Sequence, residues 1–242
     1  MKAVRLDRLL ANLGYGSRRE VEGLARAGRI RLEGQALTDA SQRIPLDPDL
    51  PARMTVQGEG LDPLPGVCLM LHKPLGVTCS HKEAGALVHG LLPERWRRRD
   101  PAVSTVGRLD KETSGLLLMT DDGALLHRII SPKADVAKRY AVTLARPLQG
   151  DEAAILASGE LMLEGEDKPL LPVEMEASDA TRCTVTLHEG RYHQVRRMFA
   201  ALGNHVDALH RDRVGGLTLP ADLEAGAFRI LGPGEIAAVF AG

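Results

Sequence analysis

Apolar residues near the start of the chain follow the period of an α-helix. Between Leu6 and Leu13 they stand at i, i+3, i+4 and i+7, which places them on one face, and Gly14 is positioned to end the helix. Ser17 and Glu20 form the S-x-x-E pattern of a capping box. The pattern therefore predicts one helix up to Gly14 and a second helix that begins after Ser17.

A β-hairpin is predicted directly after the two helices. Residues 29–32 and 36–37 have the composition of short strands, and Gly34 lies in the turn between them. Two short helices and a hairpin make a compact module, in which arginines stand between the apolar positions. The arginines that we take as candidate contacts to a polyanion are Arg5, Arg18, Arg19 and Arg29.

Proline and glycine punctuate residues 45–66, and the pattern changes after them. We place a first domain at residues 1–60, a linker at 61–66 and a second domain at 67–242. The strand-like runs of the second domain are CLMLHKP, GLLLMT, RYAVTL, CTVTLHEG and AFRIL. Its helices are expected at 124–130, at 192–202 and from Pro233 onward. This order predicts a mixed sheet with helices, and thus an α+β fold.

The net charge of −1 over 242 residues conceals an uneven distribution. Residues 1–31 hold eight Lys/Arg and three Asp/Glu, whereas residues 151–179 hold nine acids and Lys168 alone. Residues 191–213 contain five arginines, two acids and three histidines. This segregation indicates basic faces that meet a polyanion and an acidic region turned away from it, and the alternative is scattered, solvated charge.

The cysteines indicate reduced thiols, because Cys68, Cys79 and Cys183 form no C-x-x-C pair. Cys68 and Cys79 with His72 and His81 match no common zinc spacing, so we expect buried thiols, surface histidines and no metal site. No segment reaches the ~18 apolar residues of a membrane span, and no apolar signal core is present. These features are typical of a cytoplasmic protein.

Familiar nucleotide and hydrolase motifs are missing from the sequence. Neither GxxxxGK[ST], GxGxxG nor GxSxG occurs, so nucleotide use and a serine nucleophile are unsupported. The arginine-rich stretch EGRYHQVRRM, at 189–198, remains. Arg191 and Arg196 stand there at a predicted strand-to-helix junction, where guanidinium groups bind phosphate or favour the ionised form of a buried carboxylate. Arg197 alone fits a solvated helix face.

Two further stretches carry candidate chemistry. In GRLDKETSG, at 107–115, Asp110 stands among basic residues with no histidine close by in sequence to act as a base. In KRYAVTL, at 138–144, Tyr140 can stack on a nucleobase or pack into the core. A lone carboxylate does not match a glycoside hydrolase, which uses two carboxyl groups.

These stretches resemble those of a known family. GRLDKETSGLLLMTDDG is similar to the catalytic motif of the bacterial ribosomal RNA pseudouridine synthases, and KRYAVTL and EGRYHQVRRMFAALGNHV are similar to the family's following motifs. The N-terminal RLDRLLANLGYGSRREVEGLARAGRIRLEGQ resembles the S4-like (α-L) RNA-binding domain. RYHQVRRM with LHRDRVGGLTL resembles the small-subunit, RsuA type, whereas large-subunit relatives usually read GRNRQVRRM or GRNREVRRL.

The resemblance implies an isomerase without cofactor or metal, which converts a uridine of 16S ribosomal RNA, uridine 516, to pseudouridine. It implies that Asp110 is the nucleophile, which attacks either C1′ of the ribose or C6 of the base. Arg196 would pair with Asp110 and keep it ionised. Tyr140 would stack on the base once the nucleotide is flipped out, and would take part in removing the C5 proton.

The resemblance also implies contacts to RNA. Arg108 would hold the flipped nucleotide or its phosphate, and Lys138 and Arg191 would steer the backbone. The S4-like module would supply salt-sensitive phosphate contacts. The implied partner is 16S RNA within a partly assembled small ribosomal subunit, and we expect a monomer. Further contacts in the larger domain are expected from His193, Gln194 and Arg197.

Three alternatives stay open at this point. The chain could be a ribosome-assembly factor that only binds RNA, but such a protein would not need the 107–123 motif with Tyr140 and Arg196 after it. A DNA-reading helix-turn-helix fits the first two helices loosely, and it leaves the sheet domain unexplained. A synthase for 23S RNA would have the same catalytic residues.

Overall fold

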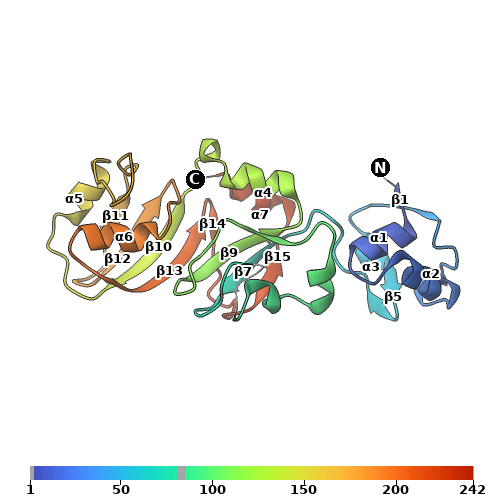
Figure 1. Cartoon of the computed structure of the whole chain (residues 1–242). Coiled ribbons are helices and arrows are strands. Elements are labelled where there is room, and N and C mark those ends of the chain that lie inside the picture. Colours follow the sequence, from blue (N-terminus) through green and yellow to red (C-terminus); the bar gives the residue numbers. More distant parts are fainter. Residues whose placement is uncertain (1–2, 81–84, 242) are drawn as a thin grey trace. The chain divides into compact units, whose positions relative to one another are not determined.

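The computed structural model describes residues 3–80 and 85–241, and the chain divides into two compact units (Figure 1). Both units combine helices and strands, which confirms the predicted α+β class. His81, weighed above as a metal ligand, lies outside the described residues. Unit 1 comprises Met1–Val67, Leu92–Ser104 and Thr120–Asp122, and unit 2 comprises Cys68–Leu91, Thr105–Met119 and Gly123–Gly242.

Unit 1 begins with the two helices that the apolar spacing predicts. Helix α1 spans Leu6–Asn12 and helix α2 spans Arg18–Arg26. The capping box is confirmed, because the backbone N–H of Glu20 donates to the Ser17 hydroxyl at 3.3 Å and the backbone N–H of Ser17 donates to the Glu20 carboxylate at 2.7 Å. The leucine face of α1 is buried in the core of this unit, as the spacing requires.

The predicted hairpin is present, and it belongs to a larger sheet. Glu33 and Gly34 between its strands have φ angles of 50° and 80°, the left-handed pair of a type I′ turn. The remaining elements of residues 1–67 are β1 Ala3–Arg5, β2 Ile30–Leu32, β3 Gln35–Ala36, β4 Arg43–Pro45, α3 Leu50–Arg53, β5 Met54–Val56 and β6 Glu59–Gly60. Four of these strands form a sheet in the order β3-β2-β5-β6, and β1 pairs with β4.

A segment distant in sequence completes unit 1. It contains a 3₁₀ helix, η2, at Glu94–Arg98. Arg95 donates to both carboxylate oxygens of Asp62, at 2.6 and 3.1 Å. Arg99 and Asp121 form an ion pair at 2.8 Å in which each side chain is 1% exposed. Because a buried charge needs such a partner, these pairs fix the segment within unit 1.

Unit 2 is built on a mixed sheet of nine described strands. The strands are β7 Cys68–Lys73, β8 Ser104–Val106, β9 Ser114–Thr120, β10 Lys138–Leu144, β11 Glu174–Ala177, β12 Arg182–Leu187, β13 Val206–Val214, β14 Leu217–Thr218 and β15 Phe228–Ile230. Their order is β11-β12-β10-β13-β9-β7-β15, with β14 on β13 and β8 on β9. Strands β9 and β13 run parallel, whereas β10 is antiparallel to both β12 and β13. Strand β13, near the middle of the sheet, is absent from the sequence prediction.

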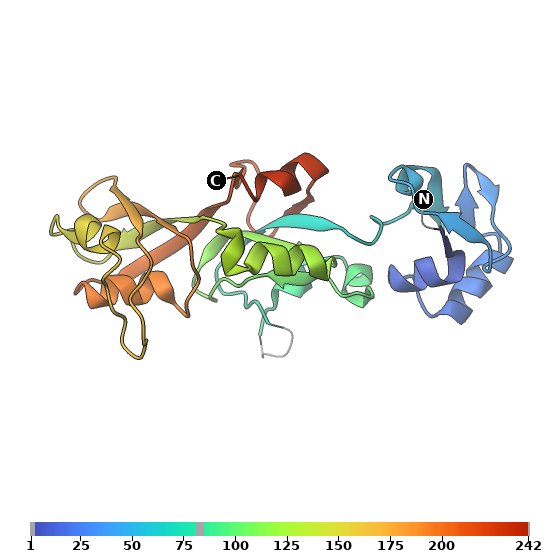
Figure 2. The same cartoon turned by 90° about the horizontal axis from the view of Figure 1, so that it is seen from above.

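Helices cover the sheet of unit 2. Helices α4, Gly123–Ile130, and α7, Pro233–Ala238, pack with β7, β9 and β13 in one apolar core (Figure 2). Helix α6, Gln194–Ala201, buries its predicted apolar stripe in a second core with β10, β12 and β13, which also receives the unpredicted helix α5, Glu152–Ala157. None of the helices in the described ranges is long and apolar enough to cross a bilayer. Single 3₁₀ turns lie at Val88–Leu91 (η1) and Pro132–Ala134 (η3).

Candidate active site

The stretch GRLDKETSG connects β8 to β9 and presents Asp110. Residues 107–113 form neither helix nor strand, and a turn closes where the Thr113 N–H donates to the Asp110 carbonyl oxygen at 3.1 Å. The Asp110 side chain is 33% exposed. A small molecule can therefore reach this carboxylate, although both ends of its loop are fixed by strands.

Gly115, the last residue of this stretch, lies where two strands approach too closely for a side chain. It pairs with Arg211 where β9 and β13 run parallel, and its φ angle is 113°. A Cβ atom at this position would lie 2.1 Å from the Arg211 carbonyl oxygen. Any larger residue would push the two strands apart and displace the loop that carries Asp110.

Lys73 holds the Asp110 loop in place through its ammonium group. The sequence analysis missed this lysine. This lysine ends β7 and is wholly buried. Its ammonium group donates to the carbonyl oxygens of Thr113 at 2.8 Å and Lys111 at 3.5 Å. Burial lowers the pKa of Lys73, and the nearby carboxylate of Asp110 acts in the opposite direction. The lysine of the HKP run is thus a positioning residue for the loop.

A cavity of about 1000 Å³ opens beside Asp110. Tyr140 of β10 and Arg211 of β13 line it from the sheet, and the end of α4 and the turn before α6 flank it. The cavity thus gathers the candidate nucleophile, the candidate aromatic residue and most of the RNA contacts that were predicted in the larger domain. The predicted site residues that line it are Arg108, Asp110, Lys138, Tyr140, Arg191, His193 and Gln194.

Arg211 is a second residue that the sequence analysis missed. It is 4% exposed, and its Nε donates to the Leu116 carbonyl oxygen at 2.8 Å. Its Nη1 donates to the Tyr140 hydroxyl at 3.4 Å. Within the described part of the chain Arg211 has no carboxylate within 4.0 Å, so it is a buried cation without an ionic partner. Arg211 therefore orients Tyr140 and adds positive charge to the cavity.

His193 places its imidazole ring next to the carboxylate of Asp110. Its Nε2 is 3.4 Å from Asp110 Oδ1. The backbone of His193 is left-handed, with φ 49° and ψ 35°, directly before α6. This conformation is uncommon for a residue with a side chain, and the surrounding turn must hold it in place. A histidine distant in sequence from Asp110 thus lies beside it in the fold.

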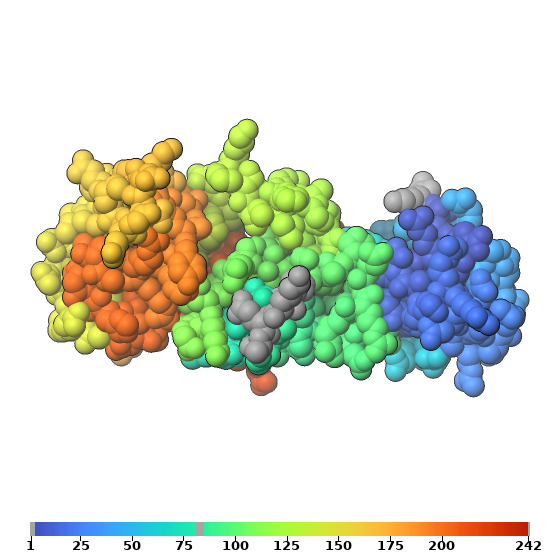
Figure 3. Space-filling view, in the orientation of Figure 1, coloured from blue at the N-terminus to red at the C-terminus, as the bar shows by residue number. Residues whose placement is uncertain are grey.

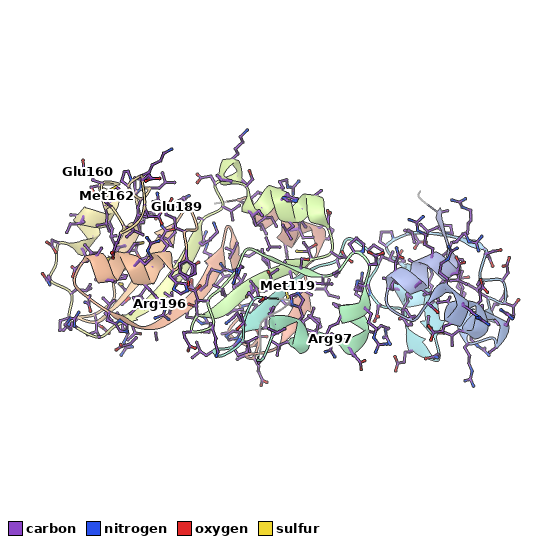
Figure 4. The ribbon with its side chains drawn as sticks, in the orientation of Figure 1. Arg97, Met119, Glu160, Met162, Glu189 and Arg196 are labelled. Atoms are coloured by element: carbon purple, nitrogen blue, oxygen red, sulfur yellow. The ribbon has the colours of Figure 1, made fainter. Side chains whose placement is uncertain are left out.

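Arg196 does not occupy the position that the resemblance implies. No ion pair within 4.0 Å joins it to Asp110 in the described structure. Its guanidinium group instead donates to the backbone carbonyl oxygens of Glu112 at 2.7 Å and Val206 at 2.8 Å. Figure 4 labels Arg196. The predicted Asp110–Arg196 pair is corrected accordingly: Arg196 holds the loop two residues beyond Asp110 through its backbone.

The acidic segment is not turned away from the arginines. Glu166 pairs with Arg191 at 3.3 Å and with Arg197 at 2.7 Å. In Figure 3 the segment around residues 160–170 lies against the residues of α6 and of the turn before it. Gln194 is buried, and its side-chain amide donates to the Glu189 carboxylate at 3.0 Å. Three of the predicted RNA contacts therefore donate their side-chain hydrogen bonds to groups within unit 2: Arg191, Gln194 and Arg197.

The remaining candidates of the larger domain also line the cavity. Lys138 donates to the Val136 carbonyl oxygen at 2.9 Å, and burial together with the charge of Arg211 lowers its pKa. Arg108 lines the same cavity. Across the described residues, no group of three or more His, Cys, Asp or Glu side chains is arranged to hold a metal ion. Cys68, Cys79 and Cys183 are buried, as predicted.

In unit 1 the predicted arginines are exposed. The Asp7 side chain is 1% exposed and forms ion pairs with two of them, Arg5 and Arg18. In each pair the arginine Nη2 lies 2.8 Å from Asp7 Oδ2. These guanidinium groups lower the pKa of Asp7 to about 2. Arg19 and Arg29 have no carboxylate within 4.0 Å in the described part of this unit. Unit 1 therefore presents forked donors to solvent, two of them preoriented by a buried carboxylate.

Unit 2 holds a partly exposed carboxylate in a cavity, unit 1 presents exposed arginines, and comparison with known proteins gives the class. The model of the RNA pseudouridylate synthase family matches residues 67–201, and the S4 domain model matches residues 4–47. The chain belongs to the RNA pseudouridylate synthase family, whose members are isomerases that act on RNA.

Individual relatives cover nearly the whole chain. The ribosomal small subunit pseudouridine synthase A of Vibrio cholerae is 38% identical over 98% of this chain and 100% of its own. The protein of the same name from Escherichia coli K12 is 39% identical, with the same coverage. An uncharacterized RNA pseudouridine synthase of Bacillus subtilis, YtzG, is 37% identical over 96% of this chain and 97% of its own. A crystal structure of a pseudouridylate synthase, 34% identical, has a TM-score of 0.68 over 98% of this chain and 99% of that one.

Proposed function

We propose that the chain converts uridine 516 of 16S ribosomal RNA to pseudouridine, with Asp110 as the nucleophile. The observation that carries the proposal is a reachable carboxylate on a fixed loop, in a cavity that Tyr140 lines from the sheet. The names of the Vibrio cholerae and Escherichia coli relatives support the small ribosomal subunit as the target. Such a substrate places the enzyme in the cytoplasm.

One carboxylate is sufficient for this reaction. The N1–C1′ bond of the nucleotide breaks and a C5–C1′ bond forms, while C5 loses a proton and N1 gains one. Substrate and product are isomers, so neither an oxidant nor an energy source enters. Attack by Asp110 on C1′ or on C6 gives a covalent intermediate, which divides one difficult step into easier ones.

The groups around Asp110 divide the remaining tasks. Lys73 and Arg196 hold its loop through backbone carbonyl oxygens, so the carboxylate does not need to be reorganised during attack. Tyr140 stacks on the flipped uracil, and its hydroxyl is oriented by Arg211. The target base must leave its stack to reach Asp110, at a cost of a few kcal/mol, and stacking on Tyr140 offsets part of that cost.

Unit 1 contributes substrate capture in this proposal. Its exposed arginines contact phosphates, which position RNA without reading its sequence. The target is a loop within 16S RNA, because unpaired nucleotides are flipped at the lowest cost. In this proposal the RNA is part of a partly assembled small subunit.

Tritium release from 16S RNA that carries [5-³H]uridine tests the proposal, since isomerisation exchanges the C5 hydrogen. We expect release by the unaltered chain, and a loss of more than about 10³-fold in Asp110→Asn. Asp207→Asn is the matched control, because Asp207 is an exposed carboxylate on β13 that does not line the Asp110 cavity. Turnover by Asp110→Asn at the rate of the control would refute the assignment.

A further inference from the structure

Tyr192 is exposed to an unusual degree for an aromatic residue. Its exposed fraction is 76%, higher than that of any other large apolar side chain in the described structure. Aromatics make up only 3% of the chain, and burial is the ordinary way in which they stabilise a fold. Tyr192 also lines the cavity that contains Asp110. An exposed aromatic ring that lines this cavity is therefore a candidate binding surface for a ligand.

The Tyr192 ring is already one layer of a stack. Its centroid is 3.9 Å from that of His193, and the two ring planes differ by 15°. His193 in turn places Nε2 at 3.4 Å from Asp110 Oδ1. The nucleophile, the imidazole and the phenol ring therefore follow one another, and the phenol ring is the most exposed of the three. One face of Tyr192 is covered by His193, and its high exposure leaves the other face open.

The turn that carries this pair is held firmly. The Arg191 N–H donates to the side-chain oxygen of Gln194 at 2.9 Å, and Arg197 donates to the Tyr192 carbonyl oxygen at 3.2 Å. The Arg191 guanidinium group donates to Glu189 at 3.0 Å and to the Lys168 carbonyl oxygen at 2.8 Å. The left-handed backbone of His193 is thereby fixed, so a ligand would meet a preformed surface.

We propose that the open face of Tyr192 binds, by stacking, the nucleobase that neighbours the target uridine in the RNA strand. The inference rests on the proposed function for the identity of the RNA. When the target base leaves the strand and enters the cavity, its neighbour loses a stacking partner. Tyr192 replaces that partner, next to the point where the strand must pass. Because every base has a π-face, this subsite tolerates any neighbouring base.

Binding of a 16S transcript to variants at position 192 tests the subsite in an Asp110→Asn background, in which affinity is measured without turnover. Tyr192→Ala should raise Kd about tenfold, within the range found for loss of one base–aromatic stack, while Tyr192→Phe and Tyr192→Trp should bind like the parent or more tightly. Tyr192→Leu, which keeps apolar area without a π-face, should resemble Tyr192→Ala. Met162→Ala removes another exposed apolar side chain, outside the cavity, and should leave Kd unchanged (Figure 4).

Salt dependence separates stacking from phosphate binding. Tyr192→Ala should shift Kd equally at all salt concentrations, because stacking releases no counterions. With Asp110 intact, Tyr192→Ala should raise KM for tritium release about tenfold and change kcat less than twofold. Parental affinity in Tyr192→Ala, or full affinity in Tyr192→Leu, would overturn the subsite. Absence of tritium release from the unaltered chain, with the Kd pattern intact, would reject the proposed reaction and leave the subsite standing.

Discussion

The two units use arginine in different ways. In unit 1, Arg19 and Arg29 are exposed, and Arg5 and Arg18 are held by one buried carboxylate with their outer parts in solvent. In unit 2, the arginines that the sequence singles out donate mainly to internal carbonyl oxygens and carboxylates. The first arrangement suits phosphate contacts, which need free donors, and the second fixes the shape of a cavity. Residue type and sequence clustering alone do not separate these two uses.

Apart from Asp110, the residue whose substitution should reduce kcat most is Lys73. Lys73 belongs to unit 2, where it holds the loop that carries Asp110. Lys73→Met leaves the Thr113 carbonyl oxygen without its donor and releases the Asp110 loop. We expect kcat to fall about 10²-fold, as for a misplaced catalytic group, with little change in RNA affinity. Single-turnover tritium release and filter binding on the same preparation measure both quantities. An equal loss in affinity and in kcat would show that Lys73 supports the whole unit rather than the loop.

Arg211 should have the next largest effect. Arg211→Met removes the donor that orients the Tyr140 hydroxyl, and loss of a hydrogen bond to a charged group predicts a fall in kcat of about 10- to 100-fold. A double-mutant cycle with Tyr140→Phe measures the coupling between the two residues. If Arg211 acts through the hydroxyl, the double variant should be no slower than the slower single variant. Strictly additive losses would contradict that route.

Salt titration compares the two sets of arginines directly. Replacing Arg19 and Arg29 together by alanine should lower the magnitude of the slope of log K against log salt by about 1.5, since two phosphate contacts are lost. Arg191→Ala should leave the slope unchanged and lower Tm by about 5 °C, because internal hydrogen bonds are lost. A reduced slope in Arg191→Ala would mean that the two units share the phosphate contacts.

Asp7 should give the smallest effect, and one that depends on pH. The pKa of Asp7 is lowered to about 2 in the folded chain from an ordinary value of 3.8, so its ionised form stabilises unit 1 above pH 3.8. This stabilisation is lost as the pH falls from 3.8 to 2. Asp7→Asn should therefore lower the free energy of unfolding by about 1–2 kcal/mol at pH 7, after allowance for the exposure of its arginine partners.

Denaturant unfolding of Asp7→Asn and of the unaltered chain at pH 7 and at pH 2 checks this prediction. The difference between the two proteins should shrink at the lower pH. A difference that is the same at both values would assign the effect to lost packing rather than to the charge of Asp7.

Sequence patterns correctly predicted the elements whose formation depends on residues close together in the chain. The leucine spacing of α1, the Ser17 capping box and the apolar stripe of α6 each depend on residues within a few positions, and each is confirmed. Strand β13 was missed because VDALHRDRV carries charged side chains at alternate and adjacent positions. Arg211 is buried there only because β9 and β10 lie on either side of it. A buried arginine of this kind leaves no sign in a single sequence.

Long-range contacts account for the other differences. Residues 92–104 fold with unit 1 through Arg95 and Arg99, whose partners lie more than twenty positions away. The position of Arg196 depends on its hydrogen bond to Glu112 in the 107–113 loop, which no spacing rule specifies. Asp110 and Tyr140, by contrast, could be selected from motifs, and both line one cavity. Residue identity was thus readable from the sequence, whereas the pairing between distant residues was not.

Mapping of pseudouridine by carbodiimide modification and primer extension tests the central claim most directly. 16S and 23S RNA from cells that lack the gene would be incubated with the unaltered chain or with Asp110→Asn. We predict a single new stop, at uridine 516 of 16S RNA, with the unaltered chain and no stop with the variant. A stop in 23S RNA, or one in 16S RNA that persists with Asp110→Asn, would contradict the account.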